Sequence, residues 1–134
     1  LARVLESVRA IDASASVCVV FGAGGDRDHE KRPMMGVAAE AHADHIILTS
    51  DNPRSEDPDS IIDAIQSGIG DRSKVEIEPD RRRAIASALA QCGVGDVVVV
   101  AGKGHETTQT IGDSVLDFDD RSVVRELLSA GRPA

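Results

Sequence analysis

Apolar residues follow two spacings that alternate along the chain. Four short runs rich in β-branched residues are typical of strands in a parallel sheet, and the last is expected to be buried along its whole length. These runs are 17–21, 46–49, 75–77 and 97–101. Between them, apolar residues recur every three or four positions, as they do on one face of a helix. The alternation predicts an α/β fold, a three-layer Rossmann-like sandwich around a mostly parallel sheet.

Helix signals accompany the segments between these runs. Pro33 and Pro58 stand in the first turn of two predicted helices, where proline is favoured. The apolar sides of the successive helices are predicted to be Leu1, Val4, Leu5, Val8 and Ile11; Met34, Val37, Ala38 and Ala41; Ile61, Ile62, Ile65 and Ile69; and Ile85, Ala88, Leu89 and Cys92. Because no capping residue precedes the first segment, we expect more chain upstream of Leu1.

The segment after residue 106 departs from this alternation. Gly112-Asp113 separates two short strand-like segments, 107–111 and 114–116, and such a turn pair is typical of an antiparallel hairpin. Asp119 and Asp120 then precede a final helix pattern. We therefore expect an antiparallel strand or hairpin at one edge of the sheet, and a single domain that spans residues 1–134.

The charge balance disfavours two classes of partner. The formal net charge is −8, from 15 basic and 23 acidic residues, so phosphate backbones and anionic membrane surfaces are repelled. The chain has two Phe and no Trp or Tyr, which leaves little for stacking of bases. We expect no nucleic-acid partner. The one basic run, 81–83, is expected to face solvent, with contact to an anion or another domain as the alternative.

The two cysteines and the hydropathy pattern bear on the compartment. Cys18 falls inside a strand-like run and Cys92 on a helix's apolar side, where free cysteine behaves as a small hydrophobic residue. A reducing, cytoplasmic setting fits them. No run approaches the roughly 18 apolar residues that span a bilayer, so we expect no membrane insertion.

Three charged loops each follow a predicted strand directly. They are Gly25-Asp26-Arg27-Asp28, Asp51-Asn52-Pro53-Arg54 and Gly102-Lys103-Gly104-His105-Glu106. Parallel strands all end at one edge of the sheet, so these loops are expected to surround one crevice. Its arginines would grip carboxylates and its acidic side chains would accept from amines. The set suits a small ligand that carries both a carboxylate and an ammonium group.

Familiar nucleotide and metal signatures fail in these loops. Arg27 stands where the dinucleotide-binding fingerprint needs its last glycine, and Gly104 follows Lys103 where a phosphate-binding loop needs Ser or Thr. His42 and His45 have no cysteine nearby, and we predict no metal site. His105 is expected either to orient a carboxylate or phosphate or merely to fix its loop.

Taken together in order, the loop motifs resemble those of a known family. Val20-Phe21-Gly22-Ala23-Gly24-Gly25-Asp26-Arg27-Asp28, Lys31-Arg32-Pro33, Asp51-Asn52-Pro53-Arg54 and Gly102-Lys103-Gly104-His105-Glu106 are similar to the C-terminal domain of the Mur ligases, which build peptidoglycan precursors. Each motif alone is weak, but the ordered set is specific and covers essentially the whole chain. The resemblance implies the amino-acid-binding domain, without the upstream UDP-sugar and ATP-binding domains.

The resemblance also implies which residues bind the amino acid. It assigns Arg27, Asp51, Asn52, Arg54, Gly102 and Glu106 to the distal end of meso-diaminopimelate. Arg54 favours diaminopimelate over lysine, because lysine-adding members depart at this position of the motif. Lys31, Arg32 and His105 are weaker candidates, which would face the phosphate end of an acyl-phosphate intermediate; Lys31 and His105 are the possible catalytic residues.

The implied reaction is ATP-dependent amide synthesis. In the full-length enzyme, ATP and Mg²⁺ would be held mainly by the central domain, and meso-diaminopimelate would be joined to UDP-MurNAc-L-Ala-D-Glu. This segment alone is expected to be inactive. Two alternatives remain: a free-standing Rossmann-like module that binds an amino acid or an anion, and a related Mur-type or folate-type ligase with another acceptor.

Overall fold

Four parallel strands form the central sheet of the computed structural model, which describes residues 1–26, 29–102 and 106–131. Their order across the sheet is β3 (Val75–Ile77), β2 (His45–Leu48), β1 (Val17–Phe21) and β4 (Val97–Val100). On β1, Val19 lies opposite Ile46 on one side and Val99 on the other. The predicted α/β class with a mostly parallel sheet is confirmed.

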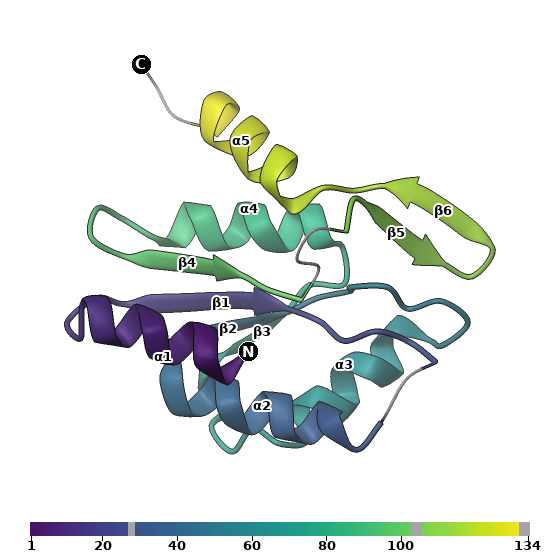
Figure 1. The fold of residues 1–134 in the computed structure, drawn as a ribbon, viewed down its shortest axis with the longest axis horizontal. Helices are drawn as coiled ribbons and strands as arrows, with labels where there is room; N and C mark the ends of the chain where they lie inside the picture. The colour runs from purple at the N-terminus through teal and green to yellow at the C-terminus, as the bar shows by residue number, and fades with distance from the viewer. Residues whose placement is uncertain (27–28, 103–105, 132–134) are drawn as a thin grey trace.

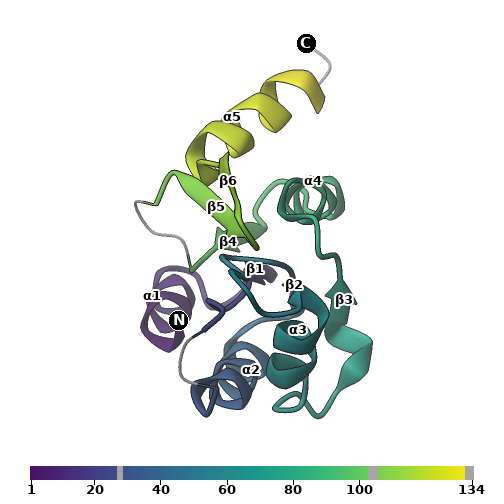
Figure 2. The ribbon, with the colours of Figure 1, turned by 90° about the vertical axis from the view of Figure 1, so that its right-hand side faces the viewer.

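Helices cover both faces of this sheet (Figures 1 and 2). One face carries α1 (Ala2–Ile11), α2 (Lys31–His42) and α3 (Pro58–Gln66), and the other carries α4 (Arg81–Gln91) and α5 (Asp120–Gly131); a short turn, η1 (Arg72–Lys74), leads into β3. Alternate strand residues supply the two cores. Val19 and Phe21 pack with Leu5 on the first side, and Cys18 and Val20 pack with Ile85 on the second.

The predicted hairpin is present but does not extend the central sheet. Its strands, β5 (Thr108–Ile111) and β6 (Ser114–Asp117), form an antiparallel sheet of their own. A single bridge joins β5 to the loop after β2: Arg54 N donates to Thr110 O at 3.0 Å, and Gly112 N donates to Arg54 O at 2.6 Å. The hairpin therefore packs against that loop at the carboxyl edge of the central sheet.

The expectation that the run 97–101 is buried along its whole length is wrong. Every residue of β4 is only half-buried. Within the described ranges, β4 has a strand neighbour on one side, β1, so it is an edge strand. Val97 and Val99 pack toward one core and Val98 and Val100 toward the other, and continuous apolar character here reflects two covered faces rather than a central position.

The predicted inner face of α2 is also wrong. Met34 and Val37 are 68% and 57% exposed, and the buried residues of the helix are Arg32, Gly36 and Ala39. A Cβ on Gly36 would lie 2.2 Å from the carbonyl oxygen of Ile65, so α2 approaches α3 through a face of small residues. That packing requires small residues, which an apolar periodicity does not single out.

The other predicted helix faces agree more closely with the structure. All four isoleucines of the third predicted face are buried, as are Ile85 and Ala88 on α4. On α1, Leu5 is buried, whereas Val4 and Ile11 are exposed. In the basic run, Arg82 and Arg83 face solvent as expected, but Arg81 is 1% exposed, so the expectation fails for that residue.

Two further features concern cysteines and membranes. Cys18 is buried, Cys92 is half-buried, and both are free thiols. Burial raises the pKa of the Cys18 thiol to about 12, so this cysteine is an unreactive core residue.

None of the helices in the described ranges has the length and apolar character to cross a bilayer.

Candidate functional site

The loops after β1, β2 and β4 meet at the carboxyl edge of the sheet, the edge that Figure 2 views. Together with the start of α2 they line an open pocket of about 330 Å³. Of the residues predicted for the site, the following line this pocket: Lys31, Arg32, Asp51, Asn52, Arg54, Gly102 and Glu106. Arg27 and His105 were also predicted, and they lie outside the described residues.

Asn52 and Glu106 are hydrogen-bonded to each other inside this group. The Asn52 side-chain Nδ2 donates to Glu106 Oε2 at 2.6 Å, and its Oδ1 accepts from the backbone N–H of Thr110 at 2.8 Å. Asn52 is only 5% exposed. Its amide is thus held by the hairpin and in turn orients the Glu106 carboxylate, so Asn52 acts on Glu106 besides any contact with a ligand.

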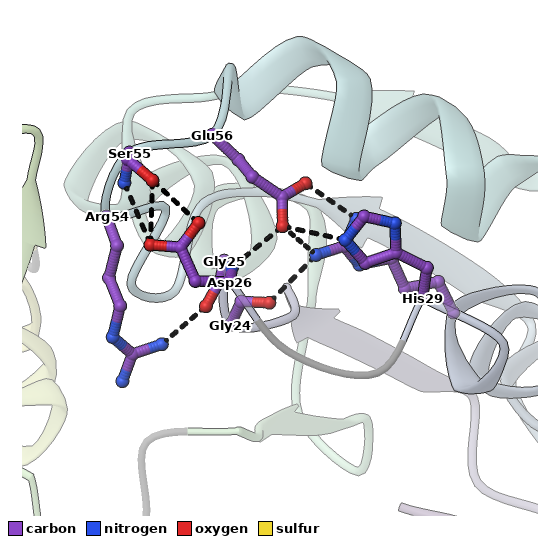
Figure 3. Close-up of polar contacts among 8 residues, drawn as sticks. Gly24, Gly25, Asp26, His29, Arg54, Ser55 and Glu56 are labelled. Atoms are coloured by element: carbon purple, nitrogen blue, oxygen red, sulfur yellow. Dashed lines mark hydrogen bonds and ion pairs between the residues drawn. The ribbon is translucent and has the colours of Figure 1, made fainter.

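Arg54 is held by its backbone in an unusual conformation. Its φ is +54°, in the left-handed region that costs an ordinary residue about 1–2 kcal/mol. The bridge to β5 fixes this backbone, and Nη1 of the side chain donates to Gly25 O at 2.9 Å (Figure 3). The rest of the guanidinium has no protein partner among the described residues. A strained residue that presents an incompletely paired guanidinium to a pocket is typical of a binding site.

Hydrogen bonds join the loop after β1 to the loop after β2. Asp26, also with positive φ (56°), accepts from the Ser55 hydroxyl at 2.6 Å, and its own backbone N–H donates to Glu56 Oε1 at 2.7 Å (Figure 3). Glu56 also lies 3.0 Å from His29 Nε2. These contacts hold Asp26 and His29, the described residues on either side of residues 27–28, to Ser55 and Glu56 in the loop after β2.

A buried arginine on α2 also binds both of these loops. Arg32, 2% exposed, donates to both Glu56 oxygens at 2.9 and 2.8 Å and to Gly24 O at 3.0 Å. These Arg32 hydrogen bonds, followed by the one from the Asp26 backbone, lower the pKa of Glu56 to about 2. Glu56 is therefore ionised at neutral pH. Arg32 lines the pocket, and its guanidinium is paired with Glu56 and Gly24; the phosphate-facing role that the resemblance implied for it stays a prediction.

Glycine is required where the loops touch through their backbones. A Cβ on Gly25 would lie 1.7 Å from Pro53 O, and one on Gly22 would lie 2.2 Å from Thr49 O. Gly102 has φ of +108°, and a Cβ there would lie 3.4 Å from Gly22 O. The segments after β1 and β2 consequently approach each other more closely than side chains permit, whereas glycine at 102 is favoured by its positive φ.

Sequence reasoning missed several of the residues that build this site. Glu56 and Ser55 follow the recognised Asp-Asn-Pro-Arg motif, and Gln109 lies on β5, where its buried side chain donates to Asp51 O at 3.0 Å. The partners of their side chains are 24 to 59 residues away along the chain. The spacing of polar residues carries no signal for such long-range pairs.

The comparisons with known proteins bear directly on this arrangement of loops. A family model described as "Mur ligase, glutamate ligase domain" matches residues 1–104. The chain belongs to the Mur ligase family. The resemblance stated from the loop motifs is thereby confirmed. The matched residues include β1, β2 and β4 and the whole of the loops after β1 and β2, whereas the loop after β4 is matched only as far as residue 104.

Curated relatives give the same family. A protein of Geobacillus thermodenitrificans is 52% identical over 96% of this chain and 26% of its own length, and one of Aquifex aeolicus is 50% identical over 94% of this chain and 26% of its own. Both are named UDP-N-acetylmuramoyl-L-alanyl-D-glutamate--2,6-diaminopimelate ligase. This Mur ligase domain spans about a quarter of the length of the relatives it matches.

A solved structure agrees with the fold. It is described as that of a UDP-N-acetylmuramoyl-L-alanyl-D-glutamate--2,6-diaminopimelate ligase, and it superimposes with a TM-score of 0.90 at 43% sequence identity. The match covers 99% of this chain and 27% of the other. The hairpin and α5, which lie beyond the family model, are therefore part of the same fold in that ligase.

Proposed function

We propose that this chain is the amino-acid-binding domain of an ATP-dependent ligase that adds meso-diaminopimelate to UDP-MurNAc-L-Ala-D-Glu. Residues 1–134 would form one domain of a longer enzyme whose other domains hold the UDP-sugar and ATP. The names of the relatives support this substrate, since each is called a 2,6-diaminopimelate ligase. By itself the domain would be inactive.

One observation carries the proposal: the Arg54 guanidinium and the Glu106 carboxylate line the same pocket. A guanidinium pairs with a carboxylate through two parallel hydrogen bonds, and a carboxylate accepts from an ammonium group. The distal end of diaminopimelate carries both groups on one carbon. We assign its carboxylate to Arg54 and Arg27 and its ammonium to Glu106, with Asn52, Asp51 and the Gly102 backbone completing the site.

Exclusion of lysine follows from the same pairing. L-Lysine has the ammonium group but lacks the distal carboxylate, so it would leave the arginines unpaired as the pocket closes. An unsatisfied charged or polar group costs about 1–3 kcal/mol or more. A site built to pair a charged group rejects an analogue that lacks it far more strongly than an apolar pocket rejects a missing methylene.

The contribution of this domain to the reaction is positioning. Gripping the distal end of diaminopimelate leaves the proximal amine to reach toward the acceptor carboxyl carbon, held by the other domains. Correct orientation of two reacting groups lowers the barrier by up to about 7–11 kcal/mol in the best cases. Closure of the domain would also keep water from an activated acyl group.

ATP would activate the acceptor by converting its carboxylate to an acyl phosphate, and the residues here fit only part of that role. Lys31 lies in the first turn of α2 and lines the pocket beside the glycine-rich loop, where its charge and the helix start suit a phosphate oxygen. The described residues contain no group of three potential metal ligands. In the proposed full-length enzyme, Mg²⁺ would be held mainly by the central domain.

Two free cysteines fit the cytoplasm as the location of the enzyme.

The experiment that tests this function measures ATP-dependent amino acid addition by the full-length protein. UDP-MurNAc-L-Ala-D-Glu is offered with either meso-diaminopimelate or L-lysine, and the peptide product is quantified. Addition of diaminopimelate with little addition of lysine is the expected result. Preference for lysine would overturn the substrate, and addition of neither would favour a module that only binds an amino acid or anion.

A further inference from the structure

Arg81 is a charged side chain buried completely at the pocket edge of the sheet. It is the first residue of α4 and is 1% exposed, whereas its neighbours Arg82 and Arg83 face solvent. Arginine is almost never fully buried unless its charge is paired. It is absent from the pocket lining, so it does not face a ligand directly.

The guanidinium of Arg81 makes four hydrogen bonds to three different elements. Nε and Nη2 donate to the two carboxylate oxygens of Asp120, at 2.8 and 2.7 Å, which neutralises the buried charge. Nη1 donates to the backbone oxygen of Ser50 at 3.0 Å, and Nη2 donates to that of Ala101 at 3.1 Å. The last two are carbonyls at the ends of β2 and β4.

These two carbonyls belong to the peptide groups that enter the site. The carbonyl of Ser50 shares a rigid plane with the backbone nitrogen of Asp51, and that of Ala101 shares one with the nitrogen of Gly102. One planar guanidinium therefore fixes both the orientation of the two peptide planes and the separation between them. The Asn52 and Glu106 side chains, whose hydrogen bond crosses the same gap, depend on that separation.

We propose that Arg81 is a positioning residue for the amino acid site, an inference that rests on the function proposed above. Arg81 holds the loops after β2 and β4 at the spacing that lets Arg54 and Glu106 grip one ligand. Gln109 reinforces it from the hairpin, since its Nε2 donates to Asp51 O at 3.0 Å and to Ser50 O at 3.4 Å. Neither residue needs to touch the ligand.

The test compares Arg81→Met with Arg82→Met in the full-length ligase. Arg82 is a matched control because it also joins α4 to α5, through a 2.7 Å ion pair with Glu126, but it is exposed and its side chain has no hydrogen bond to the Ser50 or Ala101 carbonyl among the described residues. For Arg81→Met we expect the KM for diaminopimelate to rise about ten- to a hundredfold, as a misplacement of about 1 Å would produce. The KM for ATP and the kinetics of Arg82→Met should stay within about twofold of wild type.

This readout separates positioning from simple loss of folded enzyme. A smaller folded fraction lowers the apparent kcat for every substrate and leaves each KM unchanged. No rise in the KM for diaminopimelate, or an equal rise in the KM for ATP, would overturn the inference for Arg81 while the ligase assignment stands. A wild-type enzyme that adds no diaminopimelate would instead overturn the proposed function and this inference with it.

Gln109→Ala keeps the inference testable where Arg81→Met does not fold. This variant removes the hydrogen bonds to Ser50 and Asp51 but leaves the Arg81–Asp120 ion pair intact. A selective rise of several-fold in the KM for diaminopimelate would support the role of these carbonyls. An unchanged KM would overturn it.

Discussion

Asn52 and Glu106 are joined by a 2.6 Å hydrogen bond although 54 residues separate them along the chain. Each comes from a different loop of the pocket, and the bond fixes the distance between those loops. It also determines which atoms face a ligand, because the Asn52 amide is committed to Glu106 on one side and to Thr110 on the other. The acidic side of the pocket is therefore preorganised.

Replacing Asn52 with Asp should weaken amino acid binding. The new carboxylate still accepts from the Thr110 N–H, but it faces Glu106 as a like charge in place of a donor. We expect the KM for diaminopimelate in the full-length ligase to rise at least about tenfold, the equivalent of roughly 1.4 kcal/mol. Steady-state kinetics with saturating ATP measure this. An unchanged KM would show that the Asn52–Glu106 bond does not matter to the ligand.

Glu56→Gln should change the pH dependence of stability. The pKa of Glu56 is lowered from 4.5 to about 2 in the folded state, chiefly by Arg32, so its ionised form stabilises the fold above pH 4.5. That contribution is lost as pH falls from 4.5 to about 2. Wild type should thus be more stable than Glu56→Gln at neutral pH, and the difference should shrink across this window.

Urea denaturation of the 134-residue chain at several pH values measures the difference. Glu126→Gln is the control, because Glu126 also pairs with an arginine but on an exposed surface, where such pairs contribute little. A gap between wild type and Glu56→Gln that stays constant from neutral pH to about pH 2 would contradict the assigned role of the Arg32–Glu56 pair.

Gly25→Ala should force the loops after β1 and β2 apart. The added Cβ would lie 1.7 Å from Pro53 O, and backbone on both sides must move to relieve the clash. We expect a loss of about 1–3 kcal/mol in the free energy of unfolding, typical of overpacking, and a higher KM for diaminopimelate. Gly93→Ala is the matched control, since its Cβ would lie 3.9 Å from the nearest atom, Asp96 Oδ2. Equal stability of the two variants would contradict the close approach.

The strands, the hairpin and the meeting of the three loops at one edge could be predicted from the sequence, for a physical reason. Parallel strands end at one edge, so residues placed after β1, β2 and β4 in the sequence must become neighbours. Asp51, Asn52, Arg54, Gly102 and Glu106 line one pocket on that account. The order of motifs then indicated the family, which the comparisons confirmed.

Long-range polar pairs were beyond the reach of the sequence. In the sequence, Arg81 is one of three consecutive arginines that were expected to face solvent. In the structure it is paired with Asp120, 39 residues away. The sequence does not reveal that the Arg32 guanidinium is paired with the Glu56 carboxylate. The inward face of α2 was missed because the packing against α3 needs a small residue at Gly36 rather than a large apolar one. All three depend on partners that local periodicity does not reveal.

In the proposed function, Arg54 binds the distal carboxylate of the amino acid in the pocket. The most direct measurement is the ratio of kcat/KM for meso-diaminopimelate to that for L-lysine, in the full-length ligase and in its Arg54→Ala variant. We expect a large ratio in wild type that falls at least about a hundredfold in the variant, mostly through loss of diaminopimelate use, as expected when a paired charged group is removed. An unchanged ratio would contradict this role of Arg54, because the residue would then have no part in recognising that carboxylate.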